Sequence, residues 1–88
     1  MVDKIKKIIS SKININHIEI IDQSNQHVGH SQNSGGGHYT AIIISDDFIN
    51  KNLVERHRMI YDALGNMMQN EIHAFSMKTL TVLEFKNQ

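Results

Sequence analysis

The sequence predicts one small domain, residues 1–88, of the α/β (α+β) class, in which helices cover one face of a three-stranded mixed sheet. Hydrophobic periodicity gives the order α-β-β-α-β, because two segments repeat at helical spacing and three others alternate or are rich in β-branched residues. The longer helical segment stands between the second and third strands, and such a crossover joins parallel strands. The first two strands are expected to be antiparallel neighbours, which makes the sheet mixed.

The first half of the chain is expected to form a helix, a strand and a long loop. Residues 3–13 carry isoleucines at helical spacing and lysines mostly on the opposite side, which predicts an amphipathic helix. Residues 17–22 alternate apolar and polar side chains, which predicts a short strand. Residues 23–37 hold one apolar side chain, Val28, and three consecutive glycines, which let the backbone approach a ligand closely. A loop of this length needs a functional reason.

The second half is expected to supply the other two strands. Residues 39–45 are rich in β-branched side chains and predict the central strand. Asn50 and Asn52, in the turn that follows, suit left-handed or capping conformations. Residues 72–80 predict the third strand, and a last helical turn follows it over residues 81–85.

The longest helix is expected over residues 53–69. Its predicted apolar face consists of residues at helical spacing: Leu53, His57, Ile60, Tyr61, Leu64 and Met68. Arg58 and Asp62 lie one turn apart on the predicted outer face, where they are expected to form a modest ion pair.

The composition narrows the classes of function. The chain is 40% hydrophobic and has zero formal net charge, which argues against a strong non-specific grip on nucleic acid or an anionic membrane. No apolar run approaches a membrane span and no apolar signal core is present, so we expect a cytoplasmic protein. The sequence has no phosphate loop, dinucleotide fingerprint or HExxH zinc motif, and nothing fixes a nucleophile beside a base. We therefore expect that it is not an enzyme.

Six histidines and no cysteine are the clearest chemical signal in the chain. His27, His30 and His38 crowd one glycine-rich stretch, and His73 begins the third predicted strand. Imidazole titrates near neutral pH and is the commonest metal ligand. The missing cysteine excludes disulfides and metal sites built from this chain's thiolates alone. Metal or proton chemistry on histidine is the first function to test.

Several segments, taken in order along the chain, resemble the BolA family over nearly its whole length. These segments are Asp22-Gln-Ser24 followed by His27, Gly37-His-Tyr39, Ile44-Ser-Asp-Asp-Phe48, Glu55-Arg-His-Arg-Met-Ile-Tyr61 and Ile72-His-Ala74. No single segment is decisive, but their order and spacing together are specific. Two departures stand out: Asn50 replaces a usual turn glycine, and Thr81-Val82 replaces a usual Thr-Pro, which leaves the final helix less sharply started.

The resemblance implies a small fold similar to the class II KH arrangement and a non-enzymatic role as the partner of a monothiol glutaredoxin. BolA-like proteins share a bridging [2Fe-2S] cluster with such glutaredoxins, in cluster trafficking or iron homeostasis. The family has one cluster-linked histidine in the loop between the first two strands and another at the start of the third. His73 matches the second position, and His27 matches the first with His30 as a competitor. Alone, the chain is expected to be a monomer or weak homodimer.

A [2Fe-2S] cluster bound by this chain would need ligands from other molecules. A [2Fe-2S] centre needs four terminal ligands, which are mostly thiolates, and this chain offers only imidazoles. The thiolates must then come from the cysteine of the glutaredoxin and from glutathione, so the cluster is expected only in the complex. A scaffold that docks a glutaredoxin without touching iron is a weaker rival.

A DNA-binding transcriptional regulator is the alternative function. Arg56, His57 and Arg58 after a turn look like half of a helix-turn-helix, and Lys51 adds a nearby positive charge. KH-like folds also bind nucleic acid through a Gly-x-x-Gly loop. The corresponding residues 49–52 contain no glycine and the net charge is zero, so the cluster reading is preferred.

The remaining histidines are expected to have structural roles. His38 is expected to pin the loop by hydrogen bonding at the start of its strand. His57 is expected at the core boundary with a hydrogen bond to backbone, and His17 on the surface.

Overall fold

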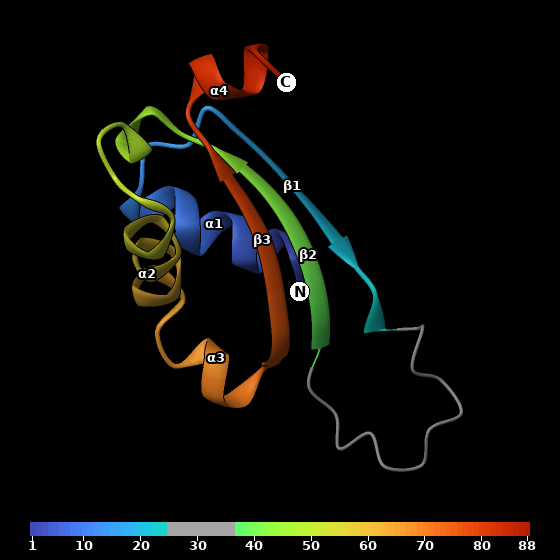
Figure 1. Ribbon diagram of the computed structural model, residues 1–88. Helices are drawn as coiled ribbons and strands as arrows, with labels where there is room; N and C mark the ends of the chain where they lie inside the picture. The colour runs from blue at the N-terminus through green and yellow to red at the C-terminus, as the bar shows by residue number, and fades with distance from the viewer. Residues whose placement is uncertain (25–36) are drawn as a thin grey trace.

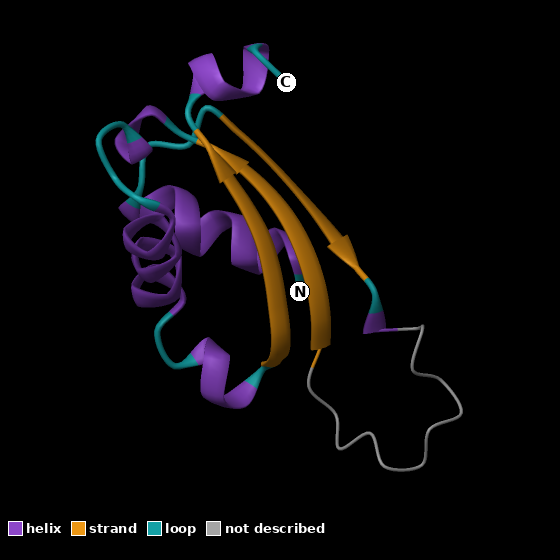
Figure 2. Ribbon diagram, in the orientation of Figure 1, coloured by secondary structure: helices purple, strands orange, loops and turns teal. Residues whose placement is uncertain are grey.

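The structure is a computed structural model and describes residues 1–24 and 37–88. Its helices and strands, in chain order, are α1 (Val2–Lys12), β1 (His17–Asp22), β2 (Gly37–Ile44), the 3₁₀ turn η2 (Asp46–Phe48), α2 (Leu53–Leu64), α3 (Met67–Asn70), β3 (Ile72–Leu80) and α4 (Val82–Lys86). Figure 1 shows these elements, and Figure 2 shows the helices gathered beside the strands. The predicted α+β class and element order are confirmed.

The sheet has the strand order β1-β2-β3 and is mixed, as predicted. β1 pairs with β2 in antiparallel fashion, so that His17 lies opposite Ile44 and Asp22 lies opposite Tyr39. β2 pairs with β3 in parallel. β2 and β3 therefore begin at the same end of the sheet, the lower end in Figure 1, while α4 lies at the opposite end.

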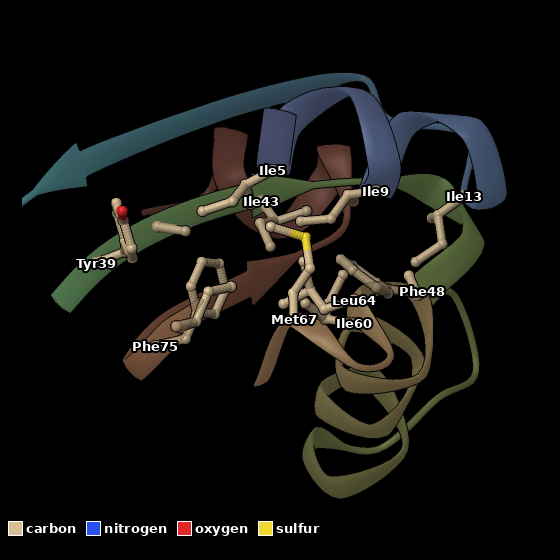
Figure 3. Close-up of a cluster of buried hydrophobic side chains, with 13 residues drawn as sticks. Ile5, Ile9, Ile13, Tyr39, Ile43, Phe48, Ile60, Leu64, Met67 and Phe75 are labelled. Carbon is tan, nitrogen blue, oxygen red and sulfur yellow. The ribbon is translucent and has the colours of Figure 1, made fainter. Parts of the chain in front are cut away.

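The core lies between one face of the sheet and the two longer helices, which alternation and helical periodicity dictate (Figure 3). Ile5 and Ile9 stand one turn apart on α1 and are fully buried. Every second side chain of β2 faces them, and α2 closes the layer with Ile60. The buried cluster consists of Ile5, Ile9, Ile13, Tyr39, Ala41, Ile43, Phe48, Ile60, Ala63, Leu64, Met67, Ile72 and Phe75.

The single helix predicted over residues 53–69 is wrong, because the chain breaks it at Gly65. This residue has φ 56° and ψ −128°, a positive-φ conformation that glycine adopts without steric cost, and α2 ends at Leu64. A separate turn, α3, then brings Met67 into the core. The predicted apolar face is also too broad, since Leu53 is 61% exposed and Tyr61 is 40% exposed.

The turn before α2 follows the prediction for both asparagines. Asn50 has φ 65°, and the side chain of Asn52 caps α2 by accepting a 2.8 Å hydrogen bond from the backbone N–H of Glu55. Asparagine tolerates positive φ better than most residues and is a favoured N-cap. The turn therefore forms without the usual glycine.

The last helix starts sharply despite the missing proline. The Thr81 hydroxyl accepts a hydrogen bond from the N–H of Glu84, and the Glu84 carboxylate accepts one from the N–H of Thr81. This reciprocal capping box satisfies two N–H groups that a new helix leaves unpaired. The expected turn over residues 81–85 is thus a capped helix.

The expected ion pair between Arg58 and Asp62 does not form. Among residues 1–24 and 37–88 the ion pairs join Lys4 to Glu71, His17 to Glu19 and Arg56 to Glu84. Arg58 and Asp62 are both exposed, and long solvated side chains gain little by holding one geometry.

Candidate metal centre

The candidate site lies at the end of the sheet where β2 and β3 begin. Gly37 pairs with Ile72, but the next residue of β2, His38, pairs with Ala74. His73 is therefore the extra residue of a β-bulge, and its side chain is exposed. Bulges redirect side chains and often lie beside functional sites. The bulge thus places the exposed His73 imidazole at the end of the sheet.

The structure brings a second histidine to His73. The rings of His38 and His73 are stacked, with 4.8 Å between their centroids and 28° between their planes. The sequence predicts only a hydrogen-bonding role for His38. A signal for the pair was present, since each of these parallel strands has histidine as its second residue and parallel strands begin at the same edge.

The backbone of His38 is hydrogen-bonded to the two residues that follow β1, while the predicted role of the histidine in pinning the loop stays a prediction. Its N–H donates to Oγ of Ser24 at 3.0 Å, and its carbonyl accepts from the N–H of Gln23 at 2.8 Å. Oγ1 of Thr40 donates to Oε1 of Gln23 at 2.7 Å. These bonds join the two ends of the segment that connects β1 to β2.

Asp22 and Ser24 complete this anchor. The N–H of Ser24 donates to Oδ1 of Asp22 at 2.9 Å. Hydrogen bonds from the Ser24 side chain and backbone lower the pKa of the Asp22 carboxyl, because they stabilise its ionised form. We name the group Asp22, Gln23, Ser24 and His38 the loop-base cluster.

Gly37 is required where β2 begins, because a Cβ atom there would collide with the ring of Tyr39. Tyr39 is 5% exposed, and its burial raises the pKa of its hydroxyl. The nearby carboxylates of Asp22 and Glu71 raise this pKa further. The ring of Tyr39 thus covers the backbone just before His38 and fixes the start of the strand.

His27 and His30, the predicted loop ligands, lie outside the described residues. Within residues 1–24 and 37–88, no group of three or more His, Cys, Asp or Glu side chains is placed to hold a metal ion. The described site therefore consists of an exposed imidazole, His73, stacked on a half-buried one, His38.

The two histidines with expected structural roles differ in outcome. His17 is on the surface as predicted, 3.4 Å from Oε2 of Glu19. His57 lies at the core boundary, but its buried Nε2 has no hydrogen-bond partner in the described part of the chain, so the predicted bond to backbone is wrong. The helix places this residue beside Val54 and Tyr61, with which it lines a depression on the surface of α2.

The candidate nucleic-acid residues have different environments. The Arg56 guanidinium makes contacts within the fold. It donates to both carboxylate oxygens of Glu84, at 2.6 and 3.1 Å. It also donates to the backbone carbonyls of Lys51 and Thr79. Its side chain is 11% exposed and lies over the ring of Phe48. Lys51 and Arg58 are exposed. The three cations therefore do not form one open basic surface.

Arg56 and Glu84 line a cleft of about 510 Å³ between η2 and α4. Asp46 and Lys86 also line the cleft, so its charged groups are of both signs. The cleft therefore lacks the concentration of positive charge that binds phosphate groups.

No helix of the described residues is long and apolar enough to span a membrane.

Known proteins resemble this chain in sequence and in fold. A family model described as BolA-like protein matches residues 9–84. An uncharacterized protein of Buchnera aphidicola is 45% identical over 86 residues, which are 98% of this chain and 81% of that protein. The DNA-binding transcriptional regulator BolA of Escherichia coli is 29% identical over 69 residues, and the match spans 64% of its length.

The fold has a solved counterpart in the BolA domain of SufE1 from Arabidopsis thaliana. The two structures have a TM-score of 0.81 at 35% sequence identity, with 93% of this chain and 92% of that chain covered. The chain spans only 24% of SufE-like protein 1 from the same plant, to which it is 33% identical over 87 residues.

Proposed function

The chain belongs to the BolA-like protein family, and from this premise we propose that it is a cytoplasmic, non-enzymatic partner of a monothiol glutaredoxin. In the complex, His73 and a loop histidine, His27 or His30, are terminal ligands of a shared [2Fe-2S] cluster. The cluster is the cargo, held for transfer in iron–sulfur trafficking or iron homeostasis.

The observation that carries this proposal is the placement of His73. Its imidazole is exposed on a bulge at the end of the sheet where β2 and β3 begin. An imidazole in that position can reach iron held on the surface of another protein, whereas a buried ligand cannot.

The donor set fits a shared cluster and does not fit a self-contained one. The chain has no cysteine, so the thiolates that such a cluster needs must come from a partner. Imidazole in place of thiolate removes negative charge from the cluster and raises its reduction potential, as in Rieske centres. This chain supplies the imidazoles, and the glutaredoxin cysteine and glutathione supply the thiolates.

The test is to assemble the chain with a monothiol glutaredoxin, glutathione, iron and sulfide and to record visible absorption and circular dichroism. We expect His73→Ala to change the visible circular dichroism of the mixture and to accelerate cluster loss. His17→Ala is the matched control, because His17 is exposed at the opposite end of the sheet. An unchanged spectrum for His73→Ala, equal to that of His17→Ala, would remove His73 as a ligand.

The loop ligand is identified by the same measurement. Of His27→Ala and His30→Ala, the variant that removes the ligand should reproduce the spectral change of His73→Ala, and the other should retain the wild-type spectrum. If the complex forms equally tightly without iron and all the histidine variants are silent, the chain is a docking scaffold instead.

Direct DNA binding is the second candidate, and the name of the Escherichia coli relative is what favours it. The test uses Lys51→Ala and Arg58→Ala, because Arg56→Ala would also remove contacts that hold the fold together. Each lost phosphate contact should reduce the slope of log affinity against log salt by about 1. Binding that is absent, or insensitive to salt, excludes this function.

A further inference from the structure

The stacked histidines lie on two neighbouring strands, where the register between β2 and β3 shifts. His38 belongs to β2 and His73 to β3, and the bulge between them lets the two rings meet at 4.8 Å. The bulge and the contact between the two rings therefore coincide at the start of the two strands.

The two histidines differ in how firmly the chain holds them. The backbone N–H and carbonyl of His38 are both bonded within the loop-base cluster, and its side chain is half-buried. His73 has an exposed side chain and is the bulged residue of an edge strand. An exposed side chain loses rotamer freedom when it binds, so a fixed ring beside it reduces that loss.

We propose that His38 is a positioning residue for His73: its ring is a platform that holds the His73 imidazole in one orientation before iron arrives. Stacking uses a face of the His73 ring and leaves its edge, which carries the nitrogen atoms, available to a ligand. Groups that orient a metal-ligating histidine through hydrogen bonds are worth about 10- to 100-fold in metal affinity, and we expect an orienting ring to act at the low end of that range. The consequence for the cluster rests on the proposed function, but the orientation of His73 does not.

Two substitutions separate a platform from a ligand. His38→Phe keeps a flat ring at the position and removes both nitrogens, whereas His38→Ala removes the ring as well. Thermal unfolding of both variants shows whether the loop-base cluster still supports the fold.

The first measurement uses the chain alone. Nuclear magnetic resonance of the His73 imidazole reports its orientation through the ring-current shift of its protons and its mobility through carbon relaxation. We expect His38→Ala to abolish the upfield shift and increase ring motion, while His38→Phe preserves both properties. If the His73 resonances of His38→Ala equal those of the wild type, the proposal is wrong.

The second measurement uses the glutaredoxin complex and follows cluster loss to a chelator. His38→Ala should lose the cluster about 10-fold faster than the wild type, and His38→Phe should match the wild type. If both variants lose the cluster equally fast and faster than the wild type, a His38 nitrogen is itself the functional group, and the platform proposal is wrong. If His73→Ala leaves the cluster spectrum unchanged, the proposed function fails, and the resonance measurement alone then decides whether His38 orients His73.

Discussion

At the scale of single residues, Gly37 sets the position of the candidate site. The Tyr39 ring occupies the space where a Cβ of residue 37 would lie, and that ring belongs to the core. The first residue of β2 is therefore fixed by packing, and His38 follows it directly. A change at Gly37 affects both the fold and the placement of the histidine pair.

We expect Gly37→Ala to lower the free energy of unfolding by about 1–3 kcal/mol, because the added methyl group must displace the buried Tyr39 ring. Urea unfolding followed by far-ultraviolet circular dichroism measures this change. Tyr39→Val provides the control background, since it removes the colliding ring. The same glycine substitution should be markedly less destabilising there, and an equal effect in both backgrounds would contradict the collision.

At the scale of elements, Arg56 and Glu84 join α2 to α4. The Glu84 carboxylate accepts hydrogen bonds from the Arg56 guanidinium and from the N–H of Thr81, so it both pairs α4 with α2 and caps α4. Arg56 adds bonds to the carbonyls of Lys51 and Thr79. This ion pair thus joins α2 to α4 at the end of the sheet that lies opposite the His38–His73 pair.

This arrangement predicts a dependence of stability on pH. The Arg56 hydrogen bond, with that from Thr81, lowers the pKa of Glu84 from 4.5 to about 2. A carboxyl with a lower pKa in the folded state stabilises the protein above pH 4.5, and that stabilisation is lost as the pH falls towards 2. We expect Glu84→Gln to lose less stability than the wild type over this range.

Urea unfolding at the two ends of that pH range measures the difference. Asp62→Asn is the control for removing one negative charge, since Asp62 is an exposed residue of α2. A Glu84→Gln protein that loses as much stability as the wild type would show that the ion pair does not contribute in this way.

The elements were predictable where the pattern is local. Residues 17–22 and 72–80 were predicted as strands with the bounds that the structure has, because alternation and flanking turn residues mark them. The helix predicted over residues 53–69 ran past Gly65, since helical periodicity continues through Met68 and a lone glycine does not always end a helix. Only the observed left-handed φ of Gly65 locates the break.

The candidate site follows from the sequence only in part. His73 begins a strand that local alternation predicts, whereas its role as a ligand comes from the resemblance to the BolA family and stays a prediction. Its stacking on His38 depends on the register between two strands and on a bulge, which no local pattern specifies. The role of Arg56 was likewise hidden, because its partner Glu84 is 28 positions away in the sequence.

At the scale of the whole molecule, the two ends of the sheet carry different functional and structural groups. The start of β2 and β3 carries the histidine pair, and the other end carries α4 and the Arg56–Glu84 ion pair (Figure 1). Within the described residues, the stacked pair of imidazoles therefore lies at one end of the sheet only. Under the proposed function, this end would take one partner molecule.

This asymmetry, which rests on the proposed function, predicts the composition of the complex. A [2Fe-2S] centre takes four terminal ligands. His73 and one loop histidine provide two, and the glutaredoxin cysteine and glutathione provide the other two.

We therefore expect a complex of one copy of this chain, one glutaredoxin, one glutathione and one cluster. Native mass spectrometry gives this composition from the mass of the intact complex. His73→Ala is the matched variant, and it should shift the population towards complexes that lack this chain, because two glutaredoxins and two glutathiones together supply four thiolates. A cluster-containing complex with two copies of this chain would contradict the ligand count, and so would a complex whose composition is insensitive to His73→Ala.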